Sequence, residues 1–257
     1  MQLLGKRVVI AGGASGIGAA TVRAFVREGA SVVSMDIDDV LGRAVVEQAS
    51  ETGPGTVAYL HCDVTSKAEV QSAFSEAVDS LHGLDVLVHT AGLEQARRPE
   101  DVTEDDIDQM LSVHVKGTIF TNQAAYESMR STGGSIINYA SVAGVQGSPF
   151  TAGYAAAKGA VLAWTRTIAK VWGAQGVRAN AVCPLILTPM AQRFRDGLTS
   201  EGLASFKRSM ALSIPLGGEF GDPDLDIAPA MVFLGSEASR FITGQTFAID
   251  GGNLMLT

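Results

Sequence analysis

Short runs of apolar, mostly β-branched residues alternate along the chain with longer stretches in which apolar residues recur every three or four positions. The first pattern is typical of buried strands and the second of amphipathic helices. Their alternation predicts βαβ units, and therefore a parallel sheet with helices on both faces. The predicted strands are Arg7–Ala11, Ser31–Asp36, Thr56–His61, Leu84–His89, Ser135–Ala140, Arg178–Cys183 and Thr246–Asp250.

Two of the helices can be delimited from their ends. Ser66 and Glu69 form a predicted capping box, apolar residues recur on one face as far as Leu81, and Gly83 follows. Another helix is expected to begin at Thr103, because the acidic residues after it are favourable at the positive end of a helix dipole. No linker, repeat or low-complexity tract interrupts the series, so we expect one domain over residues 1–257, folded as a doubly wound three-layer α/β sandwich.

The least regular stretch runs over residues 188–226 and contains several large apolar side chains. It follows the strand that ends at Cys183, and ligands of open α/β sheets bind at the carboxyl ends of strands. We therefore predict a substrate lid over 188–226. The alternative is a pair of ordinary surface helices.

Composition narrows the function classes. The 257 residues are 46% hydrophobic and 18% charged, with a net charge of −8. An acidic chain without a basic stripe is a poor partner for nucleic acid or for an anionic membrane surface. Cys62 and Cys183 stand far apart in apolar runs, which favours free thiols in a reducing compartment. With no signal-peptide pattern and no run long enough to span a bilayer, we expect a cytoplasmic protein.

A glycine-rich turn follows the first predicted strand and precedes a predicted helix. Gly12, Gly16 and Gly18 have the spacing G-x-x-x-G-x-G. Glycines allow the backbone to approach a pyrophosphate, whose charge then lies at the N-terminus of the helix. This strand–turn–helix context predicts a dinucleotide site.

Acidic residues close the second and third predicted strands. Asp36 is placed to accept hydrogen bonds from the adenosine ribose, and its charge would repel a 2′-phosphate. No lysine or arginine directly follows it or lies among the glycines, so NAD is favoured over NADP. The alternative for Asp36 is a turn residue at the start of "DIDD". Asp63, in "HCDV", is a candidate for binding the adenine amino group.

Three residues have the pattern of a catalytic site. Tyr154 and Lys158 are four positions apart and therefore share a helix face. A neighbouring ammonium favours a phenolate, so we expect Lys158 to lower the tyrosine pKa and make it a general acid or base. Ser141, at the end of a predicted strand, is placed to bind a substrate oxygen. A chance Y-x-x-x-K is the alternative, which the upstream serine disfavours.

Taken together, these motifs resemble those of the short-chain dehydrogenase/reductase family. The likeness covers essentially the whole chain. It also includes "TAG" at Thr90–Gly92, Asn180, Pro184 and "GQTFAIDGG" near the C-terminus. The resemblance implies a single Rossmann-like domain with a seven-stranded sheet, and hydride transfer between C4 of the nicotinamide of NAD and a secondary alcohol or ketone.

The resemblance also implies roles for individual residues. Tyr154 would be the proton donor or acceptor, Lys158 would bind the nicotinamide ribose, Ser141 would position the carbonyl oxygen, and Thr188 would bind the carboxamide. A homotetramer is implied, formed through helices around 104–129 and 154–173 and the C-terminal segment. Further cofactor contacts are expected from Ser15, Ile17, Ile37, Val64, Thr90, Ala91, Gly92, Pro184 and Ile186.

The chain departs from the family pattern near the site. "HTAG" replaces N-N-A-G, so His89 and Thr90 must tie the central strand to its neighbours differently. "PLILT" is one residue short, which puts the nicotinamide contacts near Leu185 and Ile186 in doubt. His114 stands where the family has an asparagine whose main chain holds a water linked to the lysine. Because histidine titrates near ~6.5, we expect His114 to join the catalytic residues, although a purely structural histidine is the alternative.

The resulting hypothesis is an NAD-dependent dehydrogenase acting on a secondary alcohol, with a hydrophobic or cyclic substrate favoured by the apolar lid. The alternatives are a reductase of 3-oxoacyl thioesters or similar ketones, and a dinucleotide-binding regulator without turnover. No metal site is expected, because the four histidines lack ligand spacing. Candidate substrate residues are Glu94, Gln95, Gln146, Phe150, Leu185, Met190, Phe194 and Met210.

Overall fold

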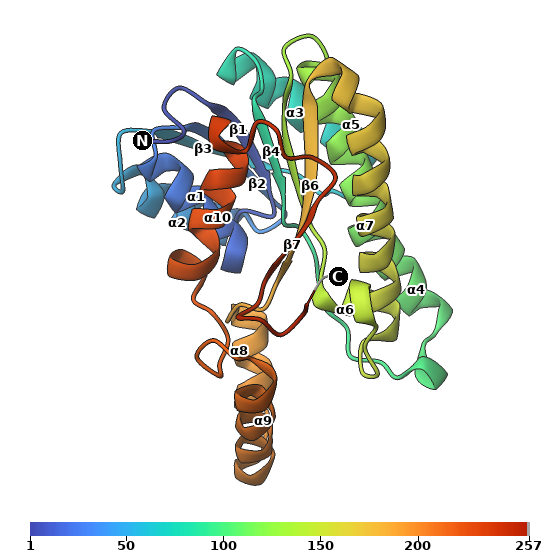
Figure 1. Cartoon of the computed structure of the whole chain (residues 1–257). Coiled ribbons are helices and arrows are strands. Elements are labelled where there is room, and N and C mark those ends of the chain that lie inside the picture. The colour runs from blue at the N-terminus through green and yellow to red at the C-terminus, as the bar shows by residue number, and fades with distance from the viewer. Residues whose placement is uncertain (256–257) are drawn as a thin grey trace.

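Seven parallel strands form one sheet in the order β3-β2-β1-β4-β5-β6-β7 (Figure 1). The computed structural model describes residues 1–255, except the side chains of Met190 and Phe194. The order reverses at β1, so the carboxyl ends of β1 and β4 lie next to each other at the switch point where such folds bind ligands. The strands are β1 Arg7–Ala11, β2 Ser31–Asp36, β3 Thr56–His61, β4 Val86–His89, β5 Gly134–Tyr139, β6 Val177–Pro184 and β7 Thr246–Ile249.

Each predicted strand is present, and the boundaries differ by at most two residues. The largest shift is at β4, which begins at Val86 rather than Leu84. Asp85 lies just before β4 and binds Arg7, accepting from its backbone N–H at 2.9 Å and from its guanidinium at 2.7 and 2.8 Å. This ion pair fixes the turn ahead of β4 and so delays the start of the strand.

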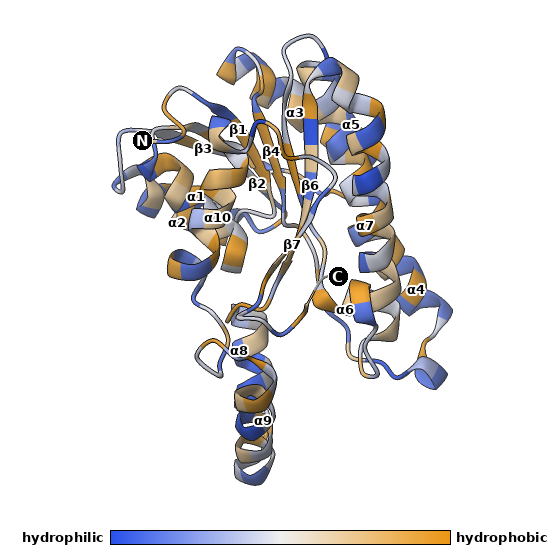
Figure 2. Ribbon diagram, viewed as in Figure 1, coloured by the Kyte–Doolittle hydropathy of each residue, from blue (hydrophilic) through white to orange (hydrophobic). Residues whose placement is uncertain are grey.

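Helices cover both faces of the sheet. Val8 and Ile10 of β1 pack toward α1 and α10, whereas Val9 and Ala11 pack toward α3, α5 and α7, as the alternation of a strand requires. The strands are accordingly hydrophobic over most of their length (Figure 2). The α-helices are α1 Gly16–Arg27, α2 Asp39–Ser50, α3 Lys67–Leu81, α4 Glu104–Met110, α5 Gly117–Met129, α6 Val142–Gln146, α7 Ala152–Trp172, α8 Pro189–Asp196, α9 Ser200–Ser213 and α10 Ala228–Gly235. Single 3-10 turns lie at Pro99–Asp101, Gly173–Gln175 and Glu237–Ser239, and a π turn at Pro223–Ile227.

The long helix expected after Thr103 contains a π turn. Thr103 caps it in a complete capping box with Asp106. The helix then runs through α4 and a π-helical segment, Leu111–Lys116, into α5. Such widened turns often occur at functional sites, and this one includes His114.

The capping box expected at the start of α3 is only half formed. Ser66 accepts the backbone N–H of Glu69 at 3.3 Å, as predicted. The Glu69 carboxylate instead accepts the N–H of Asp63 at 3.1 Å. His82 ends the helix in the left-handed region, with φ 59°, and Gly83 follows with φ 131°.

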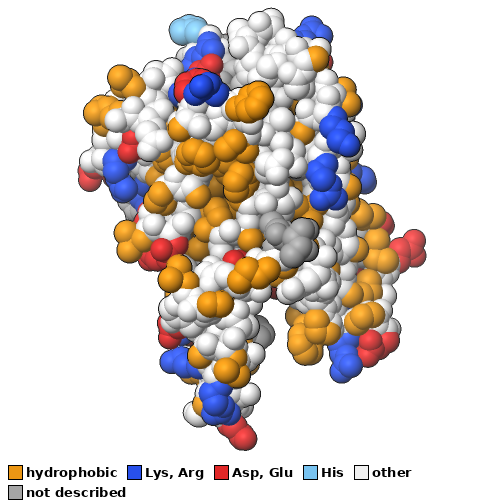
Figure 3. All heavy atoms as spheres, in the orientation of Figure 1, with side chains coloured by type: hydrophobic (Ala, Val, Ile, Leu, Met, Phe, Trp, Pro, Cys, Tyr) orange, Lys and Arg blue, Asp and Glu red, His pale blue; other side chains and the backbone are white. Residues whose placement is uncertain are grey.

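Residues 188–226 form α8, α9 and the π turn, and α9 projects from the body (Figure 1). None of the residues described in α9 is buried. The space-filling view shows an open hollow between this projection and the part of the body that carries α6 (Figure 3). Among the described residues, no helix is long and apolar enough to cross a membrane.

Candidate active site

The glycine-rich turn lies where the carboxyl ends of β1 and β4 meet. A Cβ atom at Gly12 would lie 2.3 Å from the backbone N of Ala91, and one at Gly18 would lie 1.9 Å from the carbonyl O of Gly12. Gly16 has φ +52° and opens α1. Ser15 precedes it, exposed and without a side-chain capping bond. A dinucleotide pyrophosphate fits this cradle of close backbone and free helix N-terminus.

Thr90 ties β4 to the glycine turn. Its hydroxyl lies 2.9 Å from both the carbonyl O of Ala11 and that of Gly12, and its N–H donates to Ala11 O at 2.8 Å. Thr90 therefore supplies a link between the central strands, as the departure from the family pattern required. Ala91 and Gly92 continue the wall of the cleft.

At the end of β2, Asp36 faces the glycine turn. Its carboxylate accepts the N–H of Ala14 at 3.0 Å and that of Asp38 at 3.1 Å. Asp39 lies nearby, paired with His61 at 2.8 Å. Ile37 is 65% exposed beside Asp36, so it is accessible to an adenine ring. These acidic side chains give the ribose end of the cleft a negative charge.

Asp63 and Val64 lie just beyond the end of β3. One carboxylate oxygen of Asp63 accepts both the N–H and the hydroxyl of Thr65 at 2.8 Å. Its other oxygen remains a candidate for adenine. Val64 is buried and lies within 3 Å of a Cβ built at Gly117, so it packs on α5.

Ser141, Tyr154 and Lys158 meet at the carboxyl end of β5. Ser141 caps α6, with its Oγ 3.1 Å from the N–H of Ala143, and its hydroxyl also hydrogen-bonds Tyr154. Lys158 lies one turn after Tyr154 on α7, with Nζ 5.6 Å from the tyrosine ring centre. Its ammonium donates to the carbonyl of Tyr139 at 2.7 Å. The last residue of β5 thus holds the lysine next to the tyrosine.

Burial dominates the pKa values of this pair. It raises the pKa of Tyr154 to about 12, against the opposing effect of the Ser141 hydrogen bond. It lowers the pKa of Lys158 to about 8. The expectation that Lys158 brings the tyrosine pKa below its usual value is therefore wrong for the chain alone, because desolvation disfavours both charged forms.

His114 lies in the π turn against Tyr154, with ring centres 5.2 Å apart and an edge-on angle of 84°. Its Nε2–H donates to the carbonyl of Leu93 at 2.7 Å. Burial and the charge of Lys158 lower its pKa to about 3. The expectation that His114 titrates near neutral pH is wrong, since the ring is neutral throughout that range.

His89 is a residue whose position sequence reasoning undervalued. It is buried at the end of β4, with Nδ1 2.9 Å from the hydroxyl of Thr121. Burial and Lys158 lower its pKa to about 3 as well. The sequence signal for this position was the place of His89 in "HTAG", from which only a link between strands was expected. The neighbouring strand carries its own polar link, a reciprocal amide pair between Asn138 and Asn122 at 2.8 and 2.9 Å.

The shortened loop after β6 is well tied. Leu185 donates its N–H to Ile249 at 3.0 Å and accepts the N–H of Gly221 at 3.1 Å. Ile186, after Pro184 and Leu185, is buried. Thr188 caps α8, and its methyl group would lie 3.5 Å from a Cβ at Gly16. With the loop one residue short, Thr188 still lies against the glycine turn.

The candidate substrate residues separate into groups. Glu94 lies exposed in the cleft, but enough protein surrounds its carboxyl that burial raises its pKa, and its charge acts on Tyr154. Gln95 instead donates to Asp106 of α4. Met210 lies in α9, where it lines a small hollow with Phe206 and Phe220.

The remaining candidates are Gln146, Phe150, Met190 and Phe194. Gln146 and Phe150 are exposed around the end of α6, and Phe150 uses its carbonyl to accept the N–H of Arg97 at 2.8 Å. Met190 and Phe194 belong to α8, but their side chains lie outside the described part of the structure. In residues 1–255, no group of three or more metal-ligating side chains is placed to hold an ion.

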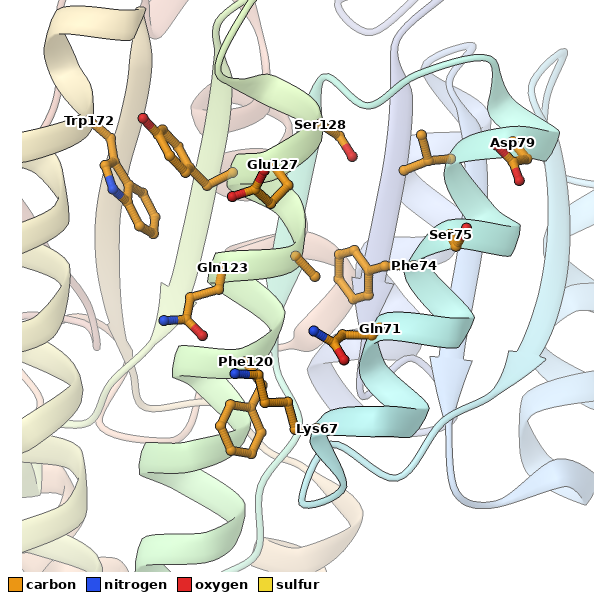
Figure 4. A pocket seen from close by; sticks show the side chains of 13 residues that line it. Lys67, Gln71, Phe74, Ser75, Asp79, Phe120, Gln123, Glu127, Ser128 and Trp172 are labelled. Atoms are coloured by element: carbon orange, nitrogen blue, oxygen red, sulfur yellow. The ribbon is translucent and has the colours of Figure 1, made fainter.

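An open groove of about 570 Å³ lies away from these residues, between α3 and α5 (Figure 4). Lys67 and Gln71 face Phe120 and Gln123 across it, and Trp172 closes one end. None of the catalytic candidates lines it, so it is not assigned to substrate.

Known proteins resemble the chain over nearly its full length. A family model described as Enoyl-(Acyl carrier protein) reductase matches residues 12–253. A 2,5-dichloro-2,5-cyclohexadiene-1,4-diol dehydrogenase from Sphingobium indicum is 38% identical over 98% of both chains. A 3-oxoacyl-[acyl-carrier-protein] reductase from Thermotoga maritima is 37% identical over 98% of this chain and 99% of its own. The solved structure of a short-chain type dehydrogenase/reductase from Mycobacterium ulcerans superposes with a TM-score of 0.91 at 27% identity, covering 98% of this chain and 91% of its own.

Proposed function

The chain belongs to the short-chain dehydrogenase/reductase family, and from this we propose that it interconverts a secondary alcohol and a ketone with NAD. Members of the family are oxidoreductases that bind a nicotinamide dinucleotide. The observation that carries the proposal is the meeting of Ser141, Tyr154 and Lys158 at the end of β5, beside the glycine cradle. A dinucleotide-binding regulator would have no need of this arrangement.

In this proposal Tyr154 moves the proton and Ser141 holds the oxygen that reacts. For oxidation, the phenolate oxygen of Tyr154 takes the hydroxyl proton, and the Ser141 hydroxyl donates to the same substrate oxygen as it becomes a carbonyl. When bound, the nicotinamide supplies the hydride acceptor. Lys158 carries a positive charge beside the ring, and that charge favours the phenolate that burial disfavours.

The preference for NAD rests on Asp36. Its carboxylate is fixed by two backbone N–H groups, and Asp38 and Asp39 follow it. A 2′-phosphate would meet this negative charge, whereas ribose hydroxyls can donate to it. A 2′-phosphate of NADP would need a cation, and the candidate is Arg43. Its guanidinium carbon lies 5.8 Å from the ring centre of Tyr59.

We propose a hydrophobic or cyclic substrate. The relative from Sphingobium indicum, named for a cyclohexadiene diol, supports a cyclic alcohol. The relative from Thermotoga maritima supports the second candidate, a 3-oxoacyl thioester. In this proposal, apolar residues of the lid 188–226 and the carboxyl of Glu94 determine the substrate specificity.

The test is absorbance at the NADH band with a panel of secondary alcohols and ketones. Turnover with cyclic alcohols and NAD supports the proposal. Turnover with 3-oxoacyl thioesters and NADPH instead supports the second candidate. If no alcohol with NAD and no ketone with NADH reacts, the catalytic proposal fails and the regulator alternative gains.

We also propose a homotetramer in the cytoplasm. Aromatic side chains of α5 and α7, including Phe120 and Trp172, line the open groove and support a contact through these helices. The buried free thiols Cys62 and Cys183 support a reducing compartment. Light scattering should give four times the chain mass of 26.7 kDa, and the mass of a single chain would contradict the assembly.

A further inference from the structure

Two buried histidines, His89 and His114, lie near Lys158. Each has one ring nitrogen that makes no hydrogen bond with the described residues. Both side chains are 1% exposed. Among the described residues, Nε2 of His89 and Nδ1 of His114 have no hydrogen-bond partner. Buried polar atoms in native proteins are normally paired, by protein or by an ordered water. Each nitrogen therefore needs a hydrogen-bond partner that the described residues do not supply.

The unpaired nitrogen of His114 carries a lone pair. Its other nitrogen, Nε2, lies 2.7 Å from the carbonyl of Leu93, and a carbonyl only accepts, so the ring hydrogen is on Nε2. A Cβ at Gly92 would lie 3.1 Å from His114 Nδ1 and 3.8 Å from Lys158 Nζ. Both nitrogens thus lie close to the same point beside Gly92.

The same holds for His89. The hydroxyl of Thr121 has one hydrogen, and the carbonyl of Gly117, 2.9 Å away, accepts it. The Thr121 oxygen then accepts from His89 Nδ1–H, 2.9 Å away, which leaves the lone pair on Nε2. The charge of Lys158 acts on this ring and favours its neutral form.

The main chain at His114 is already in use. The hydroxyl of Thr118 donates to the carbonyl of His114 at 2.6 Å. In the family pattern the main chain at this position holds the water next to the lysine. Here Thr118 takes one lone pair of that carbonyl, and two ring lone pairs are available as well.

We propose that His89 and His114 are a pair of positioning residues that hold one water against Lys158. The water would accept one ammonium N–H and donate its two hydrogens to the two lone pairs. This arrangement uses all three N–H donors of Lys158. The carbonyl of Tyr139 accepts one, the water accepts the second, and the third remains for the nicotinamide ribose. The rings anchor this water without carrying its proton, because His114 already gives its only N–H to Leu93.

The test uses the chain without cofactor, so it does not depend on turnover. It rests on the proposed function only for the importance of Lys158. Hydration cross-peaks in NMR are expected between a long-lived water and the ring Hε1 protons of both histidines. The titration of Lys158 can be followed in ¹³Cε-lysine spectra. His89→Leu and His114→Leu should each lower the pKa of Lys158 by about one pH unit, because each removes one acceptor that holds the water against the ammonium.

Two conservative variants separate the lone pair from packing. His89→Gln places an amide oxygen near the Nε2 position, and His114→Asn places one near Nδ1, so both should keep the Lys158 titration of the natural chain. His61→Leu, at an exposed histidine of β3, is the matched control and should change nothing. The proposal is overturned if the two buried leucine variants leave Lys158 unchanged, or if water contacts neither ring or only one. Failure of the alcohol assay with these results intact would overturn the proposed function alone.

Discussion

Lys158→Met should make the protein inactive but more stable. Lys158 is 5% exposed, and burial lowers its pKa from 10.5 to about 8. A basic group whose pKa is lower in the folded than in the unfolded state destabilises the fold below both values, because folding then disfavours a proton that both states carry. Methionine has a similar length and needs no water around its end.

The size of the effect follows from the shift. A shift of this size corresponds to about 3 kcal/mol, and nearly all of it is present at pH 7. The cost declines as pH rises from 8 toward 10.5, and at pH 9.5 about 1 kcal/mol remains. The variant also loses the hydrogen bond to the carbonyl of Tyr139, worth about 1 kcal/mol. A net gain of about 2 kcal/mol is therefore expected at pH 7, and little or none at pH 9.5.

Urea unfolding followed by tryptophan fluorescence, at one protein concentration and at both pH values, measures this difference. Lys170→Met is the matched control, because Lys170 is exposed on the same helix; its effect should stay within about 0.5 kcal/mol at either pH. A variant less stable than the natural chain at pH 7, or a difference that does not shrink at pH 9.5, would refute the reasoning.

Three further changes have separate outcomes. Asp36→Ala should raise the kcat/KM ratio of NADP to NAD by about tenfold or more, since a charged hydrogen bond contributes about 1.5–3 kcal/mol; an unchanged ratio sinks the ribose assignment. Tyr154→Phe should lower turnover by at least about 100-fold and leave NADH binding, followed by fluorescence, intact. Asn122→Ala removes the donor to the buried Oδ1 of Asn138, whose NH2 group keeps its bond to Thr165; the loss should lower the free energy of unfolding in urea by about 1–3 kcal/mol, whereas a loss below about 0.5 kcal/mol would contradict the pairing.

Features that depend on local pattern were predictable from the sequence. A strand such as Ser31–Asp36 is recognisable from its own residues, and Tyr154 and Lys158 share a face because they are four apart on one helix. Gly12 and Gly18 predict positions where backbone segments come close together. In the structure Gly12 lies against the backbone of Ala91, and Gly18 lies against the carbonyl of Gly12. For the same reason, helix ends with caps were found to within a residue or two.

Features that depend on which segments pack together were not predictable. Gln95 looked like a polar group for substrate, but α4 brings Asp106 to it. The pKa of Tyr154 is raised where a lower value was expected, and that of His114 lies far below the expected neutral range. Sequence spacing indicates which charge is nearby, but it does not indicate how deeply a group is buried. Burial comes from segments remote in sequence, and it outweighs a single neighbouring charge here.

Burial also determines how the site responds to pH. It pushes each titratable group around Lys158 toward its neutral form: the pKa values of His89 and His114 fall to about 3, and that of Tyr154 rises to about 12. Between about pH 5 and 7 none of these groups changes charge, and Lys158, with a pKa of about 8, is the first to titrate as pH rises. Its proton supplies the positive charge that favours the Tyr154 phenolate. A pH dependence of turnover in the cofactor complex that begins above neutrality would therefore report on the lysine. One that lies below neutrality would report on Glu94, whose pKa burial raises and whose charge acts on Tyr154, because the fold keeps both histidines neutral there.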